Sequence, residues 1–372
     1  MLYIYNIRNN FIVVGKRINM YKLDPLQSYV NDQLPKLKTI DSKDLSGMFE
    51  HFTPEEIVKQ SGMSADEIID SFRLSLITES LTEQYAKTFK LGASLHGAQW
   101  LNDYVVGFWE PDENGHADPF KNVLVDFGIN QVELDFEIGE ARESTDYQTK
   151  HNSGLHPIAL TTYGLIQECI TDYWYELQRA FFPHTSNTAK IIGKVKGREA
   201  LHTVQFRTLT ALQLESDPFL LKEVIHAIKS FEMPANHIPS VSSIEAKTQS
   251  WIPKMNGSVL KLLERIIAHI HIVLQDKEKL GKVLTEYASS KEERFFSMVP
   301  NHIVSRCLDK IKGGHGIIGE VILEDLGIVS SENEAPKTFV EEVQFRIKEV
   351  IKKWVSSNLQ LDGFVNNGKT TF

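Results

Sequence analysis

Two Glu-x-x-His pairs, Glu113–His116 and Glu199–His202, constrain the fold of this chain more than any other feature of its 372 residues. Residues three positions apart share one face of an α-helix, so each pair can point a carboxylate and an imidazole the same way. A further glutamate precedes each pair, Glu79 in one case and Glu168 in the other. Four carboxylates and two imidazoles form the ligand set with which some helical bundles hold two iron or manganese ions.

The spacing of the first glutamate pair predicts a helical hairpin. Glu79 and Glu113 are 34 positions apart, and their midpoint is His96, next to Gly97. Two side chains at one height of an antiparallel helix pair must be equally far from the turn. A turn at His96–Gly97 would therefore bring the two glutamates level with each other.

The second pair follows the same rule. Glu168 and Glu199 are 31 positions apart, and their midpoint lies near Pro183, in a stretch with the composition of a turn. The 55 positions from Glu113 to Glu168 are too many for a short turn and suit one long crossover. We therefore predict an all-α fold: a ferritin-like four-helix bundle core with one long crossover and additional C-terminal helices.

Helical periodicity dominates the whole chain, and strand-like alternation is scarce. We divide the chain into a partly disordered N-terminal extension at 1–45, a ferritin-like diiron bundle at 46–238 and a helical C-terminal extension, packed on the bundle, at 239–372. The extension is predicted to contain helices at 257–275, 277–288, 301–312 and 338–357.

Local signals refine this outline. A capping box at Ser64 predicts one long helix that runs to about Phe89. Pro111, two residues before Glu113, predicts a bend, because a proline inside a helix removes a backbone hydrogen bond. The Ser- and Pro-rich stretch 236–255 is predicted to be a loop.

Composition excludes several classes of protein. A net charge of −9 argues against a nucleic-acid-binding protein, and the lack of an apolar run of 18 residues argues against a membrane span. Two cysteines provide no disulfide framework and fit a reducing compartment, so we expect a cytoplasmic protein. The acid-free first 22 residues leave open whether translation starts at Met1 or Met20.

The region from Ser64 to Ile238 resembles the soluble acyl-carrier-protein desaturases. Five stretches carry the resemblance, in the same order as in that family: Ile77-Thr-Glu79, Trp109-x-x-Asp-Glu-Asn-Gly-His116, Gln167-Glu168 followed by Thr171, Glu199-x-x-His202, and Asp217-Pro218 followed by Met233-Pro-Ala235. The chain after Ile238 shows no visible resemblance to the family.

The resemblance implies a ferritin-like bundle, usually a homodimer, that holds two ferrous ions per chain. It implies a desaturase that takes O2 and electrons from a ferredoxin-type donor and introduces a double bond into a fatty acyl chain bound to acyl carrier protein. Thr171 matches a threonine thought to help deliver a proton to bound oxygen. A threonine in mid-helix can instead simply bond a backbone carbonyl. The six metal ligands implied are Glu79, Glu113, His116, Glu168, Glu199 and His202.

Four positions around the ligands matter because they surround the imidazoles. The family has an acid before each Glu-x-x-His and an arginine before each ligand histidine. Here Asp112 keeps one acid, Arg198 replaces the other, and Gly115 and Leu201 replace the two arginines. Outer-shell changes of this kind can cost tenfold or more in metal affinity or activity.

These departures leave three alternatives open. The first is a related diiron hydroxylase or N-oxygenase that acts on another substrate. The second is a non-catalytic ferritin-like iron-binding protein. The third is a helical scaffold without a metal, in which the ligand set is a coincidence.

Overall fold

The computed structural model describes most of the chain up to residue 274. The described residues are helical, apart from strands β1 (Tyr5–Ile7) and β2 (Asn10–Ile12), which pair antiparallel, and the connecting segments. The predicted all-α class is therefore confirmed for this part of the chain. The helices predicted at 277–288, 301–312 and 338–357 lie outside it. The residues described are 5–7, 10–12, 24–40, 50–145, 147, 154–217, 220–245 and 247–274.

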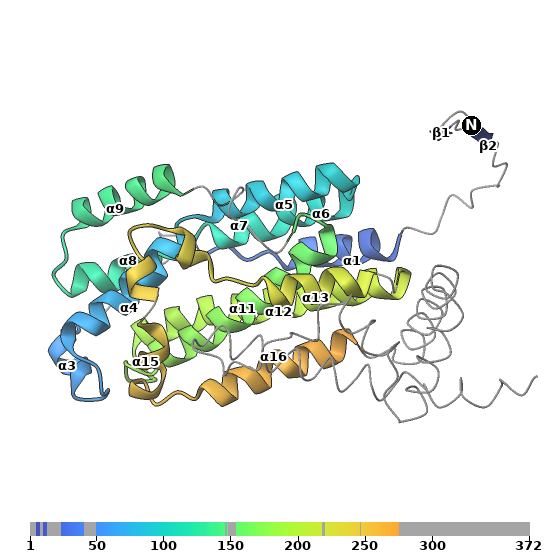
Figure 1. Cartoon of the computed structure of the whole chain (residues 1–372). Coiled ribbons are helices and arrows are strands. Elements are labelled where there is room, and N and C mark those ends of the chain that lie inside the picture. Colours follow the sequence, from blue (N-terminus) through green and yellow to red (C-terminus); the bar gives the residue numbers. More distant parts are fainter. Residues whose placement is uncertain are drawn as a thin grey trace, which may run out of the picture.

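Helices of very different length make up this structure (Figure 1). In chain order they are α1 (Pro25–Gln33), η1 (Leu34–Lys36), α3 (Pro54–Val58), α4 (Ala65–Glu79), α5 (Thr82–His96), α6 (Gln99–Tyr104), η2 (Val105–Trp109), α7 (Glu110–Glu113), α8 (Ala117–Asp126), α9 (Gln131–Ser144), α11 (Pro157–Arg179), α12 (Asn187–Ser216), α13 (Leu221–Lys229), η4 (Pro234–His237), α14 (Ser242–Glu245), α15 (Thr248–Lys254) and α16 (Val259–Val273).

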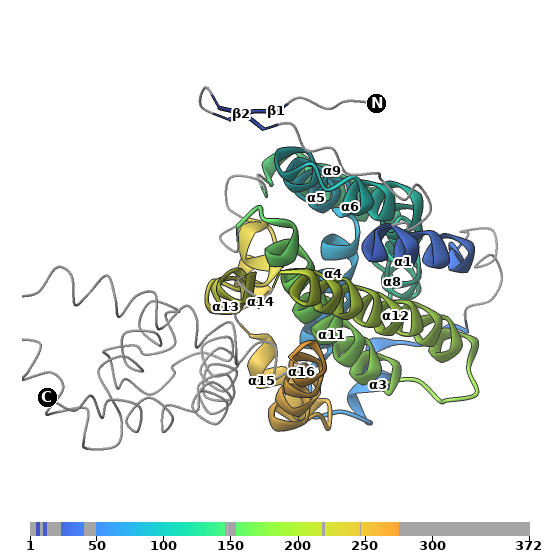
Figure 2. The same ribbon diagram turned by 90° about the vertical axis from the view of Figure 1, so that its right-hand side faces the viewer.

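Both hairpin turns predicted from the glutamate spacing are confirmed. Helix α5 ends at His96, Gly97 adopts the left-handed conformation with φ +61°, and α6 begins two residues later. The left-handed backbone conformation costs glycine little free energy because glycine has no Cβ atom, so Gly97 suits this turn. Helix α11 ends at Arg179, and α12 begins after Ser186, whose hydroxyl accepts a hydrogen bond from the Ala189 amide. Helices α11 and α12 pack along much of their length (Figure 2).

The prediction of one unbroken helix from Ser64 to Phe89 is wrong. The helix breaks directly after Glu79, and α5 starts at Thr82. The Ser80 hydroxyl donates to the Leu76 carbonyl at 2.7 Å, and the carbonyl of Ser80 accepts a hydrogen bond from Arg142 Nε at 3.0 Å. The break is therefore stabilised by a side chain from α9, far away in the sequence.

A π-helix, η2, occupies the five residues that end two positions before Pro111. Proline has no amide hydrogen to donate to the preceding turn, so the backbone before it can accept a wider turn at low cost. Short π-helices are frequent at functional sites because the extra residue re-aims the side chains that follow. The bend predicted near Pro111 therefore takes the form of a π-helix, and Glu113 follows it at the end of α7.

The loop predicted at 236–255 is also wrong, because this stretch forms η4, α14 and α15. Trp251 is fully buried, and its indole Nε1 donates to Glu67 Oε1 at 3.1 Å. Lys254 Nζ reaches the same carboxylate oxygen at 2.5 Å. Burial of this tryptophan against α4 fixes a segment whose composition alone indicates a loop.

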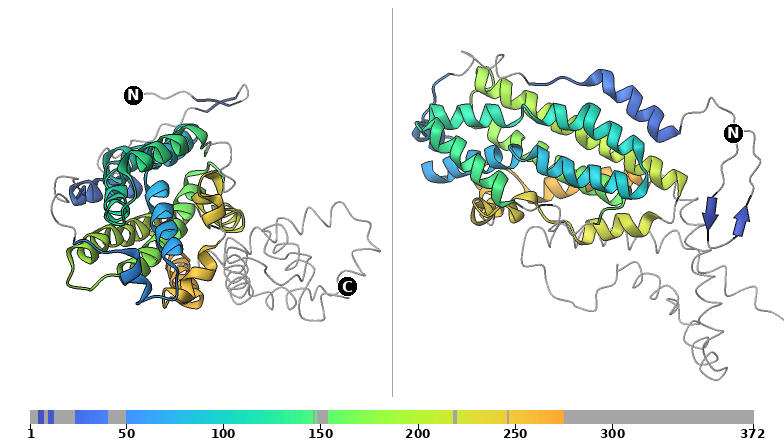
Figure 3. Two further views of the ribbon diagram at one scale, coloured as in Figure 1. Left: turned by 90° about the vertical axis from the view of Figure 1, so that its left-hand side faces the viewer. Right: turned by 90° about the horizontal axis from the view of Figure 1, so that it is seen from above.

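The N-terminal extension contributes an element to the core. Val30 of α1 is fully buried, and Gln33 accepts a hydrogen bond from the Gln205 amide of α12 at 3.3 Å. Figure 2 shows α1 above and α16 below α12, against which both pack. Helix α9 lies on the outside, away from α11 and α12 (Figure 3). Residues 34–40, which continue from α1 across α7 and α12, are called the strap below.

Candidate metal centre

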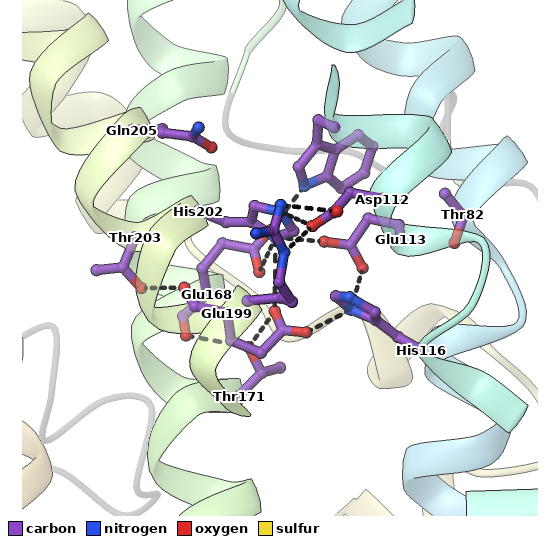
Figure 4. Close-up of polar contacts among 12 residues, drawn as sticks. Thr82, Asp112, Glu113, His116, Glu168, Thr171, Glu199, His202, Thr203 and Gln205 are labelled. Carbon is purple, nitrogen blue, oxygen red and sulfur yellow. Dashed lines mark hydrogen bonds and ion pairs between the residues drawn. The ribbon is translucent and has the colours of Figure 1, made fainter. Parts of the chain in front are cut away.

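The six candidate ligands predicted from the sequence converge at one place inside the helices. Figure 4 shows Glu113, His116, Glu168, Glu199 and His202 there. Glu79 and Glu113 are the last residues of α4 and α7, and His116 immediately precedes α8. Glu168 lies in the middle of α11, while Glu199 and His202 lie one turn apart in α12. All six side chains are buried. The break after Glu79 and the π-helix before Glu113 both fall at the cluster, so irregular helix geometry coincides with it.

The cluster consists of two overlapping groups. Within each group, one nitrogen or oxygen atom from every residue lies within 4.8 Å of the others, which is close enough to hold a metal ion. Glu113 and Glu199 belong to both groups. The first group is Glu79, Glu113, His116 and Glu199, and the second is Glu113, Glu168, Glu199 and His202.

The two shared carboxylates lie between the imidazoles. Glu113 Oε2 is 3.1 Å from His116 Nδ1, and Glu113 Oε1 is 2.7 Å from His202 Nδ1. Glu199 Oε1 is 2.7 Å from His116 Nδ1, and Glu199 Oε2 is 4.0 Å from His202 Nδ1. The imidazole rings stack with centroids 5.8 Å apart. Each shared carboxylate thus turns one oxygen toward each imidazole.

The polar atoms at the centre fit a metal better than they fit one another. Buried polar atoms nearly always have a hydrogen-bond partner. Here Glu113 Oε1, Glu199 Oε1 and Nδ1 of both histidines have no hydrogen-bond partner among the described residues, although their contacts are as short as 2.7 Å. Oxygen and nitrogen lone pairs that point to one place but form no hydrogen bonds with one another can bind a common cation instead. Carboxylate and imidazole donors suit first-row divalent metals such as iron and manganese.

The electrostatics of the cluster also favour bound cations. Burial and the neighbouring Glu113 carboxylate raise the pKa of Glu79 and Glu199 well above the usual range. Burial opposes ionisation of Glu113 too, but the two imidazoles lower its pKa. Burial would lower the pKa of His202, yet Glu113 and Asp112 raise it well above 6.5. Without a metal, protons must neutralise the cluster, whereas two divalent cations would balance four carboxylates.

Two aromatic donors hold the outer glutamates. Trp109 Nε1 donates to Glu168 Oε1 at 3.1 Å, and the Tyr175 hydroxyl donates to Glu79 Oε1. Sequence reasoning missed Tyr175. It lies seven positions after Glu168, two turns along the same face of α11, and that spacing could have identified it.

Asp112 supports the cluster from outside. Its Oδ2 accepts a hydrogen bond from His202 Nε2 at 2.8 Å. The guanidinium of Arg198 binds both oxygens of this carboxylate, with Nε···Oδ2 at 2.6 Å and Nη2···Oδ1 at 2.7 Å. The strap completes the arrangement: Lys38 N donates to Asp112 Oδ1, and Arg198 donates to the Lys36 carbonyl, each at 3.3 Å. Arg198 is therefore the partner of Asp112.

The other two departures from the desaturase pattern also have a local explanation. A Cβ atom on Gly115 would lie 2.2 Å from the carbonyl oxygen of Ile40, so the strap occupies the space that a side chain would need. Leu201 is half-buried and packs against the hydrophobic core. A large charged side chain at position 115 is thus incompatible with the strap as it lies.

Thr171 sits beside the cluster, one turn from Glu168 in α11. Its Oγ1 lies 3.3 Å from the Gln167 carbonyl, 3.1 Å from the Glu168 carbonyl and 3.3 Å from Glu199 Oε2. The hydroxyl has one proton, so it can donate a well-aligned hydrogen bond to only one of these three oxygens at a time. Both interpretations of this threonine, bonding to its own helix and exchanging a proton at the cluster, are geometrically available.

A cavity opens beside the cluster on the side of Thr171. Glu79, Glu113, Glu168 and Glu199 line it. Glu245 lies on the wall, and burial raises the pKa of this carboxyl group to about 7. Most of the remaining wall is apolar or aromatic, including Leu74, Ile170, Trp174, Met233, Ile252 and Leu262.

Comparison with known proteins assigns the chain to no family. No protein-family model matches it, and no curated protein shows significant similarity to it. Through the residues described up to 274, none of the helices is both long and apolar enough to cross a membrane.

Proposed function

We propose that this chain is a diiron oxidoreductase of the soluble acyl-carrier-protein desaturase type. One observation carries the proposal: Glu113 and Glu199 are shared by two groups of potential ligands, and each turns one oxygen toward each imidazole. Glu79 and His116 on one side, Glu168 and His202 on the other, and the shared Glu113 and Glu199 would hold two ferrous ions. When bound, such ions supply the oxygen chemistry.

The ferritin-like core belongs to this proposal. Four helical rods make up this core: α4 continued by α5, α6 continued through η2 and α7 to α8, α11, and α12. The first rod packs against the second, and α11 packs against α12. The connection from α8 to α11, which includes α9, is the long crossover that the ligand spacing predicts. The six residues come from these four rods, which is how ferritin-like proteins build a dinuclear site. In this scheme the bundle spans 46–238.

The residues around the ions have separable tasks. Trp109 and Tyr175 orient the two outer glutamates, while Asp112 orients His202. Thr171 Oγ1, at 3.3 Å from Glu199 Oε2, can hold a proton at the edge of the cavity and pass it on. The buried walls keep water from the reacting atoms.

The apolar lining of the cavity supports the proposal of a substrate with an apolar part. Its wall beyond the glutamates is mostly aliphatic and aromatic, so a fatty acyl chain would bury apolar surface along it. Removal of two hydrogens from the chain, together with two electrons from the donor and two protons from solvent, would reduce O2 to two waters. We propose acyl carrier protein as the acyl donor, a ferredoxin-type electron donor and a homodimer, in line with the resemblance.

A second candidate function has one observation in its favour. Glu245 adds an ionisable carboxyl group to the mostly apolar part of the wall beyond the four glutamates, and a plain hydrocarbon chain would leave it without a partner. A hydroxylase or N-oxygenase whose substrate carries a polar or basic group would satisfy it.

Product analysis separates the two candidates. Iron-loaded protein with an electron donor, O2 and stearoyl acyl carrier protein should yield an acyl chain that lacks two hydrogens. A product that gains one oxygen atom would favour the second candidate. No oxygen-dependent product from acyl or amine substrates, despite two bound irons, would overturn both and leave an iron-binding protein. Glu110→Gln is a suitable control, since Glu110 lies on α7 but pairs with Lys90 outside the cluster.

A further inference from the structure

The two halves of the candidate centre differ outside the ligands. His202 points Nδ1 at the shared carboxylates and Nε2 at Asp112 Oδ2, 2.8 Å away. His116 also points Nδ1 at the shared carboxylates, but its Nε2 is buried with no hydrogen-bond partner among the described residues. The two imidazoles thus offer equivalent inner atoms and have very different outer environments.

The difference follows from one exchange of residue type. Asp112 precedes Glu113 of one motif and reaches the histidine of the other motif. Arg198 precedes Glu199, so it holds the corresponding position in the second motif. A guanidinium has no acceptor atom and cannot take the proton of an imidazole. Arg198 therefore pairs with Asp112, and no described residue provides an outer acceptor for His116.

An outer carboxylate changes what an imidazole can do for a metal. An imidazole that binds through Nδ1 must carry its proton on Nε2. An acceptor at Nε2 fixes this tautomer and the orientation of the ring, and it makes the binding nitrogen more basic. His202 has this support, since Asp112 is fully buried and held by Arg198. For His116 the same tautomer leaves a buried N–H that no described residue accepts, which is unfavourable.

We propose that the two metal positions are not equivalent: the position beside His202 binds a divalent cation more tightly than the position beside His116, and Asp112 is the positioning residue that makes the difference. This inference rests on the proposed function, because it presupposes a dinuclear site. It predicts stepwise loading, in which the ion beside His116 is the first to be lost and the one that exchanges with other divalent metals.

Equilibrium dialysis of the full-length chain against Mn²⁺ tests the inference without any assay of activity. We expect two bound ions per chain, in two steps whose dissociation constants differ at least about tenfold. Asp112→Asn keeps the shape of the side chain but removes its charge, and it should weaken the tighter step about ten- to a hundredfold while changing the weaker step little. The control Glu110→Gln removes a carboxylate from the same helix away from the histidines and should change neither step.

A measurement on the unaltered protein covers the case in which Asp112→Asn fails to fold. Crystals prepared with one Mn²⁺ per chain should show a stronger anomalous peak beside His202 than beside His116. Equal peaks, equal binding steps, or equal weakening of both steps by Asp112→Asn would overturn the inference and leave the proposed dinuclear site intact. Absence of bound Mn²⁺ and Fe²⁺ would overturn the proposed function, and the inference with it.

Discussion

The substitution Gly115→Ala tests whether the strap lies against the candidate centre. A Cβ atom at this position would be 2.2 Å from the Ile40 carbonyl oxygen, whereas ordinary contacts begin at 3.4 Å. Gly115→Ala must therefore move the strap by about the difference between the two, roughly 1 Å. The obstacle is backbone, so no side-chain rotation can relieve the clash.

The magnitude follows from overpacking. Forcing extra carbon into a packed site typically costs about 1–3 kcal/mol. Each kcal/mol lowers the melting temperature by about 2–4 °C in domains of 150–250 residues, so we expect a loss of about 2–12 °C. The Lys38 N···Asp112 Oδ1 hydrogen bond, at 3.3 Å, moves with the strap, so affinity for a metal at His202 should fall as well.

Differential scanning calorimetry of Gly115→Ala beside Gly139→Ala provides a matched comparison. A Cβ on Gly139, inside α9, meets no atom of the described residues within 4 Å, so alanine there should stabilise the helix by up to about 1 kcal/mol. The same chemical change is thus expected to act with opposite sign at the two positions. If Gly115→Ala is as stable as Gly139→Ala, the strap does not pack over the centre as described.

Three further substitutions test other parts of the structure. Glu245→Gln should flatten the pH dependence of the free energy of unfolding in the metal-free protein. Burial raises the folded-state pKa of Glu245 from 4.5 to about 7, so the unaltered protein loses about 3 kcal/mol of stability as pH rises through that window. An unchanged pH dependence in urea titrations of the variant would contradict the burial of this group. Phe72→Ala should lower the free energy of chemical unfolding by about 3–5 kcal/mol, because Phe72 is fully buried among four aromatic rings. The Phe136 side chain is 65% exposed, so Phe136→Ala should lower it by less than about 0.5 kcal/mol. Thr171→Val should lower oxygen-dependent turnover by about a hundredfold or more with both irons retained. The Thr203 hydroxyl bonds the Glu199 backbone carbonyl, so the control Thr203→Val should leave turnover nearly unchanged, and equal rates for the two variants would mean that Thr171 only bonds its own helix.

The sequence was sufficient to predict the hairpin turns and which six residues meet. Helical spacing places Glu113 with His116 and Glu199 with His202, and equal distances to the turns at Gly97 and Pro183 bring the glutamates level. These relations are local or involve a single turn, so periodicity captures them. That the six residues bind metal remains a prediction.

Features that depend on contacts between distant segments could not be predicted. The helix break after Glu79 is stabilised by Arg142, which is 62 positions from its partner Ser80. The Asp112–Arg198 pair joins residues 86 positions apart, and neither motif alone indicates it. The short helices at 234–254 depend on the burial of Trp251 against α4, which composition does not show.

The number of iron ions bound per chain tests the proposed centre most directly. After anaerobic loading with Fe²⁺ and removal of excess metal, we expect two ions per chain. Glu199→Ala removes a carboxylate shared by both groups, so it should abolish iron retention with little change in helix content by circular dichroism. No bound iron in the unaltered chain, continued uptake of many ions per chain, or two retained ions in Glu199→Ala would contradict the proposed site.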